Sequence, residues 1–516
     1  MRLIDYFDRG AQLAPDAPCF SDLEQSLPYR TVARDSHRIA NGLVAAGLKP
    51  GAIVATLTPN HLCAFLPPLG IQRAGMVWLP LNVRYGPEEL LYAVITNDCD
   101  FIFFHSSLGD LVEELLVRCP RLAGAVAIDH GVGASPDLQA WMAQWPDTPV
   151  NVEQEPDTLV RIASSGGTTG PSKGIIQTNE TIETQLSCML AMIPMGPQPV
   201  HLAAAPLSHM AGSLCWPTMI FGGETVILPK ADPGAILEAI ARFGITHMAL
   251  TPTMIYMLLD HPDAQTTDYA SLRNIIYAGA PMSVEKLKSA VQIFGPVMTQ
   301  AFGQAEASFV CTVLSPQEHV INGDPRQLRR LHSCGRATPF VRIEIMDEDG
   351  GLLPTGERGE IVVRSNLVSP GYYKNPEATA AVSKGGWHLT GDIGYKDDEG
   401  YLYIVDRKRD VIISGGFNIF PGEIEQVIWA HPAVKDCAVV GVPDDKWGEA
   451  VKAVIELNEG AAVEAEEIIE LCRTRVGSMK APKTVDFWSE LPRSSIGKVL
   501  KREIRDRFWK GRGRAV

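Results

Sequence analysis

Residues 51–80 read GAIVATLTPNHLCAFLPPLGIQRAGMVWLP, and the alternation within this stretch indicates the fold class. The apolar run Ile53–Leu57 has the length and composition of a buried strand, whereas His61–Gly75 is long enough for a helix. The run Met76–Leu81 is strand-like again, and a further helix-like and strand-like pair follows, ending at Phe104. Strands that alternate with helices predict a parallel sheet covered by helices.

The same alternation returns between His201 and Gly279, where strand-like segments such as Glu224–Pro229 are separated by helical ones such as Pro233–Phe243. After about residue 335 the segments become Gly-rich and strand-like. From about Asp410 a smaller α+β rhythm follows. The predicted fold class is α/β: a large N-terminal domain of parallel or mixed sheets with helices, a β-rich subdomain, and a small α+β C-terminal domain. Ligands of open parallel sheets bind beyond the carboxyl ends of the strands, so chemistry is expected in the loops there.

The composition limits the class of protein. The 516 residues carry a formal net charge of −14, which argues against nucleic acid as the main partner. The ten cysteines form no CxxC pair or Cys/His cluster, which indicates reduced and mostly buried thiols. The first residues lack the apolar core of a signal peptide, and prolines and glycines interrupt the most apolar stretch, 201–228. We therefore expect a cytoplasmic protein with no transmembrane segment.

A loop rich in glycine and hydroxyl side chains, SSGGTTGPSKG, occupies Ser164–Gly174. Its backbone N–H groups, hydroxyls and lysine suit an anion, because glycine lets the backbone approach phosphate oxygens closely. The spacing is not that of a Walker A loop. A flexible linker is the alternative interpretation of the loop taken alone. The candidate phosphate ligands are Ser165, Gly166, Gly167, Thr168, Thr169, Gly170 and Lys173.

This loop resembles the TSGTTGxPKG signature of the acyl-adenylate-forming superfamily, which includes acyl-CoA synthetases, peptide-synthetase adenylation domains and luciferases. It departs from the signature at Gly166 and Ser172, neither of which removes the main donors. Further motifs that resemble those of the family follow in the expected order over essentially the whole chain: PLSHMAG (206–212), AGAP (278–281), FGQAE (302–306), WHLTGD (387–392), VDRKRDVIISGGFNIFPGEIE (405–425) and PRSSIGK (492–498).

The resemblance implies an AMP-forming ligase with ATP, Mg²⁺ and coenzyme A as cofactors. A carboxylate would attack the α-phosphorus of ATP to give acyl-AMP and pyrophosphate, and a thiol would then take the acyl group. Glu306 would hold Mg²⁺, and Lys498 would bring the substrate carboxylate and the α-phosphate together. The resemblance makes four residues catalytic candidates: Thr168, His209, Glu306 and Lys498.

The resemblance also assigns the nucleoside contacts. Asp392 would accept hydrogen bonds from both ribose hydroxyls, because a carboxylate offers two oxygens at the spacing of a vicinal diol. Arg407 would add a ribose contact. Ala305 replaces the usual threonine at the α-phosphate. The remaining adenine and pocket-wall candidates are Ala278, Gly279, Ala280, Pro281, Phe302 and Gly303.

The charged run 406–410 corresponds to the hinge about which a small mobile C-terminal domain rotates in this family, with Arg409 at the hinge position. The predicted division is therefore 1–405 for the adenylation domain, 406–410 for the hinge and 411–516 for the mobile domain. Rotation would replace Lys498 with a glycine loop that lines the thiol tunnel. The candidates for this tunnel and for contacts to CoA are Gly415, Gly416, Trp447, Lys480 and Lys483.

His209 resembles the histidine beside the acyl pocket, and the pocket candidates are Met210, Ala211, Cys215 and Phe309. Their small or apolar side chains favour an apolar medium- or long-chain fatty acid, or an aromatic or alicyclic acid. Two alternatives stay open: a stand-alone adenylation enzyme that loads a carrier protein, and a nucleotide-binding relative without catalysis. The expected partners are the small-molecule acid, ATP and CoA, with no nucleic acid; homodimerisation is left open.

Overall fold

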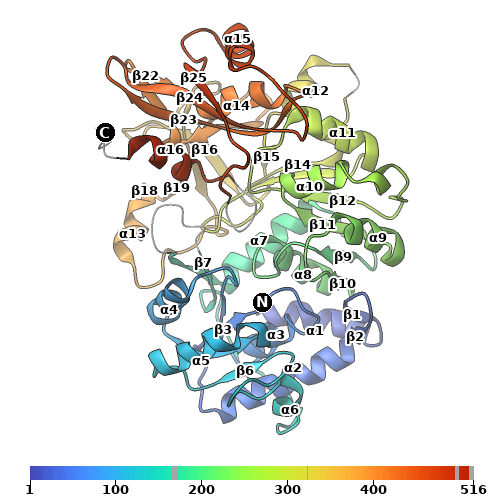
Figure 1. The fold of residues 1–516 in the computed structure, drawn as a ribbon. Helices are drawn as coiled ribbons and strands as arrows, with labels where there is room; N and C mark the ends of the chain where they lie inside the picture. The colour runs from blue at the N-terminus through green and yellow to red at the C-terminus, as the bar shows by residue number, and fades with distance from the viewer. Residues whose placement is uncertain (165–171, 322, 494–498, 511–516) are drawn as a thin grey trace.

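The computed structural model describes residues 1–164, 172–321, 323–493 and 499–510. Within these ranges, four β-sheets with helices packed on them form a large N-terminal part and a small C-terminal part, which lies at the top of Figure 1. The predicted α/β fold class is confirmed.

The first sheet contains the strands that the alternation of residues 51–104 predicted. All of its neighbouring strands run parallel except the last pair, β7 and β8, which is antiparallel. Its strands, in spatial order, are β6 (Ala125–Ala127), β5 (Cys99–Phe104), β3 (Ile53–Leu57), β4 (Val77–Pro80), β7 (Leu159–Ser164) and β8 (Gly174–Thr178). Around it lie α2 (Tyr29–Ala45), α3 (Leu66–Arg73), α4 (Pro87–Thr96), α5 (Gly109–Arg118) and α6 (Leu138–Met142).

The helix predicted over His61–Gly75 is shorter than expected, because α3 begins only at Leu66. Pro67 and Pro68 lie in its first turn, where a missing N–H costs no helical hydrogen bond. The residues before them form a turn in which the Cys63 N–H donates to His61 Nδ1 over 3.2 Å. Two prolines thus place the helix start about five residues later than apolar periodicity suggested.

The second sheet has a parallel centre with antiparallel strands at both edges. Its strands, in spatial order, are β15 (Arg336–Ala337), β14 (Thr312–Leu314), β13 (Met298–Phe302), β12 (Asn274–Tyr277), β11 (His247–Leu250), β9 (Val200–Ala203), β10 (Glu224–Ile227), β1 (Pro18–Ser21) and β2 (Ser26–Pro28). Its helices include α1 (Leu3–Leu13), α7 (Asn179–Met192), α8 (Met210–Ile220), α9 (Pro233–Phe243), α10 (Pro252–Leu259) and α11 (Val284–Phe294).

One hydrophobic core joins these two sheets. The ring of Phe65 lies 5.7 Å from that of Trp78 on β4 and 5.5 Å from that of Trp216 on α8, measured between centroids. Each of the three side chains is at most 4% exposed. Because burial of apolar surface contributes about 25 cal/mol per Å² relative to the unfolded chain, this contact fixes one sheet against the other.

The Gly-rich region after residue 335 forms the β-rich subdomain, which is preceded by α12 (Pro325–Arg330). Its strands are β16 (Arg342–Met346), β17 (Gly359–Arg364), β18 (Ser383–Lys384), β19 (Trp387–Lys396) and β20 (Leu402–Arg407), and α13 (Pro376–Ala381) lies beside them.

The C-terminal part packs helices on a sheet of its own. Its elements are β21 (Ile412–Ser414), β22 (Phe417–Ile419), α14 (Pro421–Trp429), β23 (Val434–Asp444), β24 (Gly448–Leu457), α15 (Ala465–Val476), β25 (Thr484–Phe487) and α16 (Lys501–Trp509). The exact boundaries of the two domains and the hinge stay a prediction.

Two expectations from composition can be compared with the structure. All ten cysteines are free thiols, and nine of them are buried. Among the described residues, no helix is both long and apolar enough to span a membrane.

Candidate active site

A carboxylate, a phenol and an amine lie together beyond the carboxyl end of β13. The hydroxyl of Tyr372 donates to Glu306 Oε1 over 2.8 Å, and the Nζ of Lys173 lies 5.1 Å from the centroid of the Tyr372 ring. Burial and the neighbouring carboxylate raise the pKa of Tyr372, so its hydroxyl stays protonated and donates. Three segments far apart in the sequence thus meet at Tyr372.

The predicted phosphate loop is described only at its end. Lys173 precedes β8, but Ser165, Gly166, Gly167, Thr168, Thr169 and Gly170 lie outside the described residues. Tyr372 was missed by the sequence analysis. It forms an isolated β-bridge with Ile175 of β8, which brings it beside the loop, and no motif contains it.

A second cluster surrounds Asp392 on β19, which is 2% exposed. Arg407 lies directly opposite on β20, and its Nε is 2.8 Å from Asp392 Oδ1. Gln304 donates from Nε2 to Asp392 Oδ2 over 3.1 Å and to the Thr390 carbonyl over 2.7 Å. Antiparallel register therefore explains why two residues fifteen positions apart form an ion pair.

Gln304 was also missed, although it lies inside the FGQAE motif between two residues that were named. Its neighbour Gly303 has no room for a side chain, because an added Cβ would lie 2.5 Å from the backbone nitrogen of Phe309. Phe309 itself has a φ of 61°, which is uncommon for a bulky residue. Ala305 packs partly buried against Ala163, Ile175 and Tyr372.

The AGAP and FGQAE segments lie side by side, because β12 and β13 are parallel neighbours and both segments follow the carboxyl ends of these strands. Gly279 has a φ of 83°, which favours glycine. Ala278 and Phe302 are buried, Ala280 is half-buried, and Gly279 and Pro281 are exposed.

His209 is the residue before α8, and its Nδ1 is 2.8 Å from the hydroxyl oxygen of Ser208. Burial, followed by the positive charges of Arg161 and Arg84, lowers the pKa of His209 to about 4. The imidazole is therefore neutral at physiological pH. Of the pocket candidates that follow on α8, Met210 is half-buried, while Ala211 and Cys215 are fully buried.

The C-terminal candidates divide into two groups. Lys498 lies outside the described residues. The residues on either side of its segment are anchored by carboxylates: Arg493 to Asp436 and Glu456, at 2.7 and 3.0 Å, and Lys501 to Glu425 at 2.8 Å.

The glycine loop and the candidate CoA residues lie in a different environment. Gly415 and Gly416 are exposed, and the Gly415 N–H donates to the carbonyl of Trp447 over 2.8 Å. The Trp447 side chain is 46% exposed. Lys480 pairs with Glu423, and Lys483 Nζ donates to the carbonyl of Ser478 over 3.0 Å.

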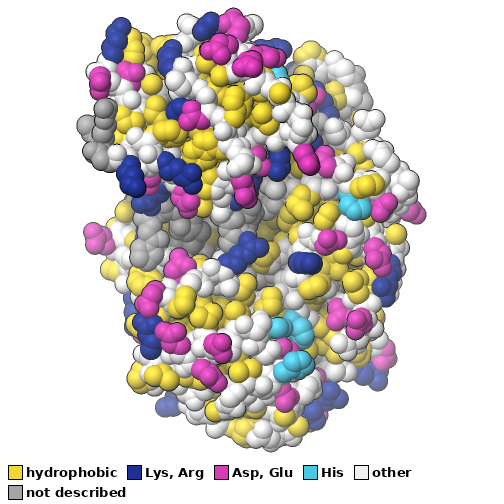
Figure 2. All heavy atoms as spheres, in the orientation of Figure 1, with side chains coloured by type: hydrophobic (Ala, Val, Ile, Leu, Met, Phe, Trp, Pro, Cys, Tyr) yellow, Lys and Arg dark blue, Asp and Glu magenta, His cyan; other side chains and the backbone are white. Residues whose placement is uncertain are grey.

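Arg409 lies in a short 3₁₀ turn, Lys408–Asp410, which joins the two parts of the chain. Burial lowers the pKa of its guanidinium. One contact between the parts is the ion pair of Arg358 Nη2 with Glu423 Oε1, at 2.7 Å. On the face shown in Figure 2, the surface is hollowed where the C-terminal part meets the larger one, and Lys and Arg side chains gather above the hollow.

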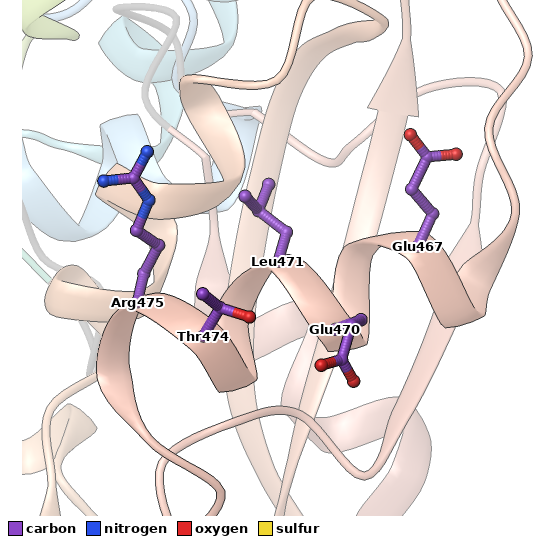
Figure 3. Close-up of a pocket in the computed structure, with 5 residues that line it drawn as sticks. All are labelled: Glu467, Glu470, Leu471, Thr474 and Arg475. Carbon is purple, nitrogen blue, oxygen red and sulfur yellow. The ribbon is translucent and has the colours of Figure 1, made fainter.

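A depression of about 620 Å³ lies elsewhere, on the outer surface of α15. Figure 3 shows that its labelled side chains come from a single helix; they are Glu467, Glu470, Leu471, Thr474 and Arg475. Ligand sites are enclosed by several elements, and this depression contains none of the motif residues, so we do not assign the acyl site to it.

Comparison with known proteins agrees with this arrangement. Residues 7–373 match the model of the AMP-binding enzyme family, and residues 423–498 match that of the AMP-binding enzyme C-terminal domain. The chain is 42% identical over 388 residues to a medium/long-chain-fatty-acid–CoA ligase, FadD8, of Mycobacterium tuberculosis, with 74% of this chain and 67% of that protein covered. It is 35% identical to a feruloyl-CoA synthase of an Amycolatopsis species, with 97% and 98% covered.

A solved structure extends the likeness to the fold. The amide bond synthetase McbA of Marinactinospora thermotolerans superimposes with a TM-score of 0.89 at 31% identity, with 98% of this chain and 100% of that chain covered. The chain thus belongs to the AMP-binding enzyme family and, within it, to the acid–CoA ligase type.

Proposed function

We propose that the clusters around Glu306 and Asp392 bind the two ends of ATP for adenylation of an apolar acid. In the first half-reaction an oxygen of the acid's carboxylate attacks the α-phosphorus, and pyrophosphate leaves. In the second, the sulfur of coenzyme A attacks the acyl carbon, AMP leaves with the former carboxylate oxygen, and the thiol proton is released. No side-chain nucleophile is needed, so the protein contributes positioning and charge stabilisation.

The Glu306 cluster fits the triphosphate end. A carboxylate oxygen is a preferred ligand of Mg²⁺, which usually takes one or two carboxylates together with substrate phosphates. Among the described residues, no group of three or more His, Cys, Asp or Glu side chains forms a metal cage, which agrees with such a shared site. When bound, Mg²⁺ would neutralise charge on the phosphate oxygens. Tyr372 orients the Glu306 carboxylate, and Lys173 supplies a cation beside the Tyr372 ring.

The Asp392 cluster fits the ribose. Arg407 and Gln304 each engage one oxygen of the carboxylate, which fixes its orientation. A carboxylate offers two oxygens at the spacing of a vicinal diol, which suits the two ribose hydroxyls. Phe302 and the 278–281 segment, on the neighbouring strand ends, would lie along the adenine.

His209 would border the acid in its neutral form. A neutral imidazole beside an apolar acyl group carries no net charge that would have to be desolvated. The relatives are named for fatty acids and for ferulate, which supports an apolar aliphatic or aromatic acid as substrate.

The thioester step requires the C-terminal part to move under this proposal. The loop Ser414–Gly416, proposed to line the thiol tunnel, reaches the surface in this structure. Rotation about Arg409 would exchange it with the segment that carries Lys498. Coenzyme A is the proposed acceptor. A carrier protein stays a second candidate, because the similar McbA is named for forming amides and the fold therefore serves more than one acceptor.

The observation that carries the proposal is that the loop after β13 joins two clusters. Its Glu306 accepts from Tyr372, whose ring lies beside Lys173, and its Gln304 donates to Asp392, which pairs with Arg407. The test is pyrophosphate release with ATP, Mg²⁺ and a panel of fatty, aryl and alicyclic acids. Asp392→Asn serves as the matched variant, because it preserves shape and removes the charge. Acid-dependent release that falls in this variant supports the proposal, and release with no acid of the panel contradicts it. Addition of CoA or a carrier protein then identifies the acceptor.

A further inference from the structure

Arg161 is half-buried on β7, and no carboxylate among the described residues forms an ion pair with it. It occupies the middle of β7 between Val160 and Ile162, which are both fully buried. Its guanidinium lies 4.7 Å from the centroid of the Trp78 ring, and its Nη2 donates to the carbonyl of Ser208 over 3.2 Å. Its Nε is buried and has no hydrogen-bond partner among the described residues. Burial lowers the pKa of Arg161 to about 10.

A more deeply buried arginine shows how this fold balances such a charge. Arg73 is 5% exposed and forms an ion pair with Asp8, and its Nε donates to the hydroxyl of Ser36 over 2.6 Å. All three nitrogens of that guanidinium therefore donate a hydrogen bond. A buried donor without a partner is costly, so the unpaired Nε of Arg161 requires an explanation.

The residue beside Arg161 carries the complementary open group. Gln177 lies opposite it on β8, so the two side chains share one face of the sheet. Gln177 is 3% exposed, and its Nε2 donates to Ser308 Oγ over 2.9 Å. Its Oε1 is buried, and no described residue donates a hydrogen bond to it. One N–H donor and one carbonyl acceptor are therefore left open on neighbouring positions.

These two side chains connect the segments that we propose as walls of the acyl pocket. Arg161 contacts Ser208, the residue before His209, and Gln177 contacts Ser308, the residue before Phe309. The open donor and acceptor thus lie where the two walls meet. A group that accepts one hydrogen bond and donates another would satisfy both, and a hydroxyl is the smallest that does so.

We propose that Arg161 and Gln177 bind a hydroxyl group on the acyl part of the acid. The hydroxyl oxygen accepts from Arg161 Nε, and its proton is donated to Gln177 Oε1. The inference deepens the proposed function and rests on it, because it requires an acid-activating enzyme. The substrate class it assigns is a hydroxylated acid on an otherwise apolar skeleton. Such a site rejects the analogue that lacks the hydroxyl, since its own polar groups would then stay unpaired.

The first experiment uses the wild-type protein and matched acids. Pyrophosphate release is measured with phenylpropenoic acid, with each of its ring-hydroxylated derivatives and with the matching methyl derivatives, and likewise with octanoic acid and its terminally hydroxylated form. We expect kcat/KM for one hydroxylated acid to exceed that of its hydrogen and methyl analogues by about tenfold or more. If the unsubstituted acids react as well as every hydroxylated one, Arg161 Nε and Gln177 Oε1 do not bind a substrate hydroxyl and the inference is overturned.

Variants then test the two residues. Arg161→Met and Gln177→Met should each lower kcat/KM for the preferred hydroxylated acid by about tenfold, mainly through KM, and leave the unsubstituted analogue unchanged or improved. Arg34→Met, which removes an arginine whose side chain is 46% exposed, controls for the loss of one positive charge. An equal loss for both acids in the Met variants assigns the pair to packing and contradicts the inference. If Arg161→Met does not fold, Gln177→Met and the wild-type comparison decide the question.

The outcomes separate this inference from the proposed function. Absence of pyrophosphate release with all of the acids contradicts the proposed function. Release with acids of the panel but without preference for a hydroxyl leaves the proposed function intact and overturns only the hydroxyl site.

Discussion

The two halves of the candidate site are held in different ways. In the large domain, the side chain of Asp392 is fixed by Arg407 and Gln304 and that of Glu306 by Tyr372, through hydrogen bonds between packed elements. In the C-terminal domain, Gly415 and Gly416 lie at the surface, and the ends of the Lys498 segment are anchored to their own domain by ion pairs. The first half is held by contacts between separate packed elements. The second keeps its contacts within the C-terminal part, which in the proposed function changes its orientation between the two reaction steps.

The largest expected effect is the loss of one reaction step, adenylation, while the other step, thioester formation, continues. Lys498→Ala should lower the rate of adenylation by about 10²–10³-fold or more, because one positioned charge is lost where two anions meet. Conversion of supplied acyl-AMP to the thioester should be much less impaired. The measurement is pyrophosphate release beside thioester formation, with Lys510→Ala, an exposed tail lysine, as control. Equal loss in both steps would assign Lys498 to the fold of its domain.

Arg409→Pro tests whether the second half has to turn. Proline restricts φ, so a hinge that must change its backbone angles loses that freedom. We expect adenylation to stay near the wild-type rate and thioester formation to fall by about tenfold or more. Pyrophosphate release without a matching amount of CoA ester is the signature. Normal turnover of the variant to acyl-CoA would mean that the comparison of a fixed and a moving half is wrong at this residue.

Tyr372→Phe tests how strongly the fixed half depends on its supports. The change removes only the hydroxyl that donates to Glu306. A hydrogen bond to a charged group contributes about 1.5–3 kcal/mol, of which the carboxylate can recover part from water, so we expect a loss of about tenfold in kcat/KM for ATP. The Mg²⁺ concentration for half-maximal rate should rise as well. Tyr373→Phe, the adjacent tyrosine that donates to Asp98, is the matched control.

The smallest expected effect concerns pH. The pKa of His209 is lowered from its usual 6.5 to about 4, so the folded protein gains no proton there until the pH falls well below the ordinary range. Its contribution to stability is present above about pH 6.5 and is lost as the pH falls towards about 4. Activity from pH 6 to 8 should therefore show no transition due to His209. His209→Asn, compared with wild type over this range, should change the rate but not the shape of the profile; a step that disappears in the variant would contradict this.

The motifs predicted single residues better than the partnerships between them. Asp392 and Glu306 are visible because each lies in a recognisable segment. Gln304 was passed over although it lies two residues from Glu306, because its role depends on β19 closing against the FGQAE loop. Tyr372 is 66 residues from Glu306 and belongs to no motif. Long-range contacts of this kind follow from sheet packing, which local patterns do not encode.

Two features of the sequence carry more information than the predictions drew from them: a charged residue within a buried strand and two prolines within a predicted helix. Arg161 is a charged residue in the middle of a segment, LVRIAS, that otherwise has the composition of a buried strand. Such a residue is a candidate for function because burial of an unpaired charge is costly. Conversely, the helix at 61–75 was predicted too long because apolar spacing outweighed Pro67 and Pro68, whose chemistry limits where a helix can begin.

The ion pair between Arg358 and Glu423 has a consequence for how fast the domains can separate. Its two side chains are 42% and 21% exposed, and partly exposed pairs of this kind typically contribute no more than about 1 kcal/mol. That energy is about twice RT, so thermal motion readily breaks such an ion pair. Dissolved ions screen it further, with a Debye length of about 8 Å at physiological ionic strength. Under the proposed rotation, this weak contact would favour the orientation seen here and would break readily as the C-terminal part turns.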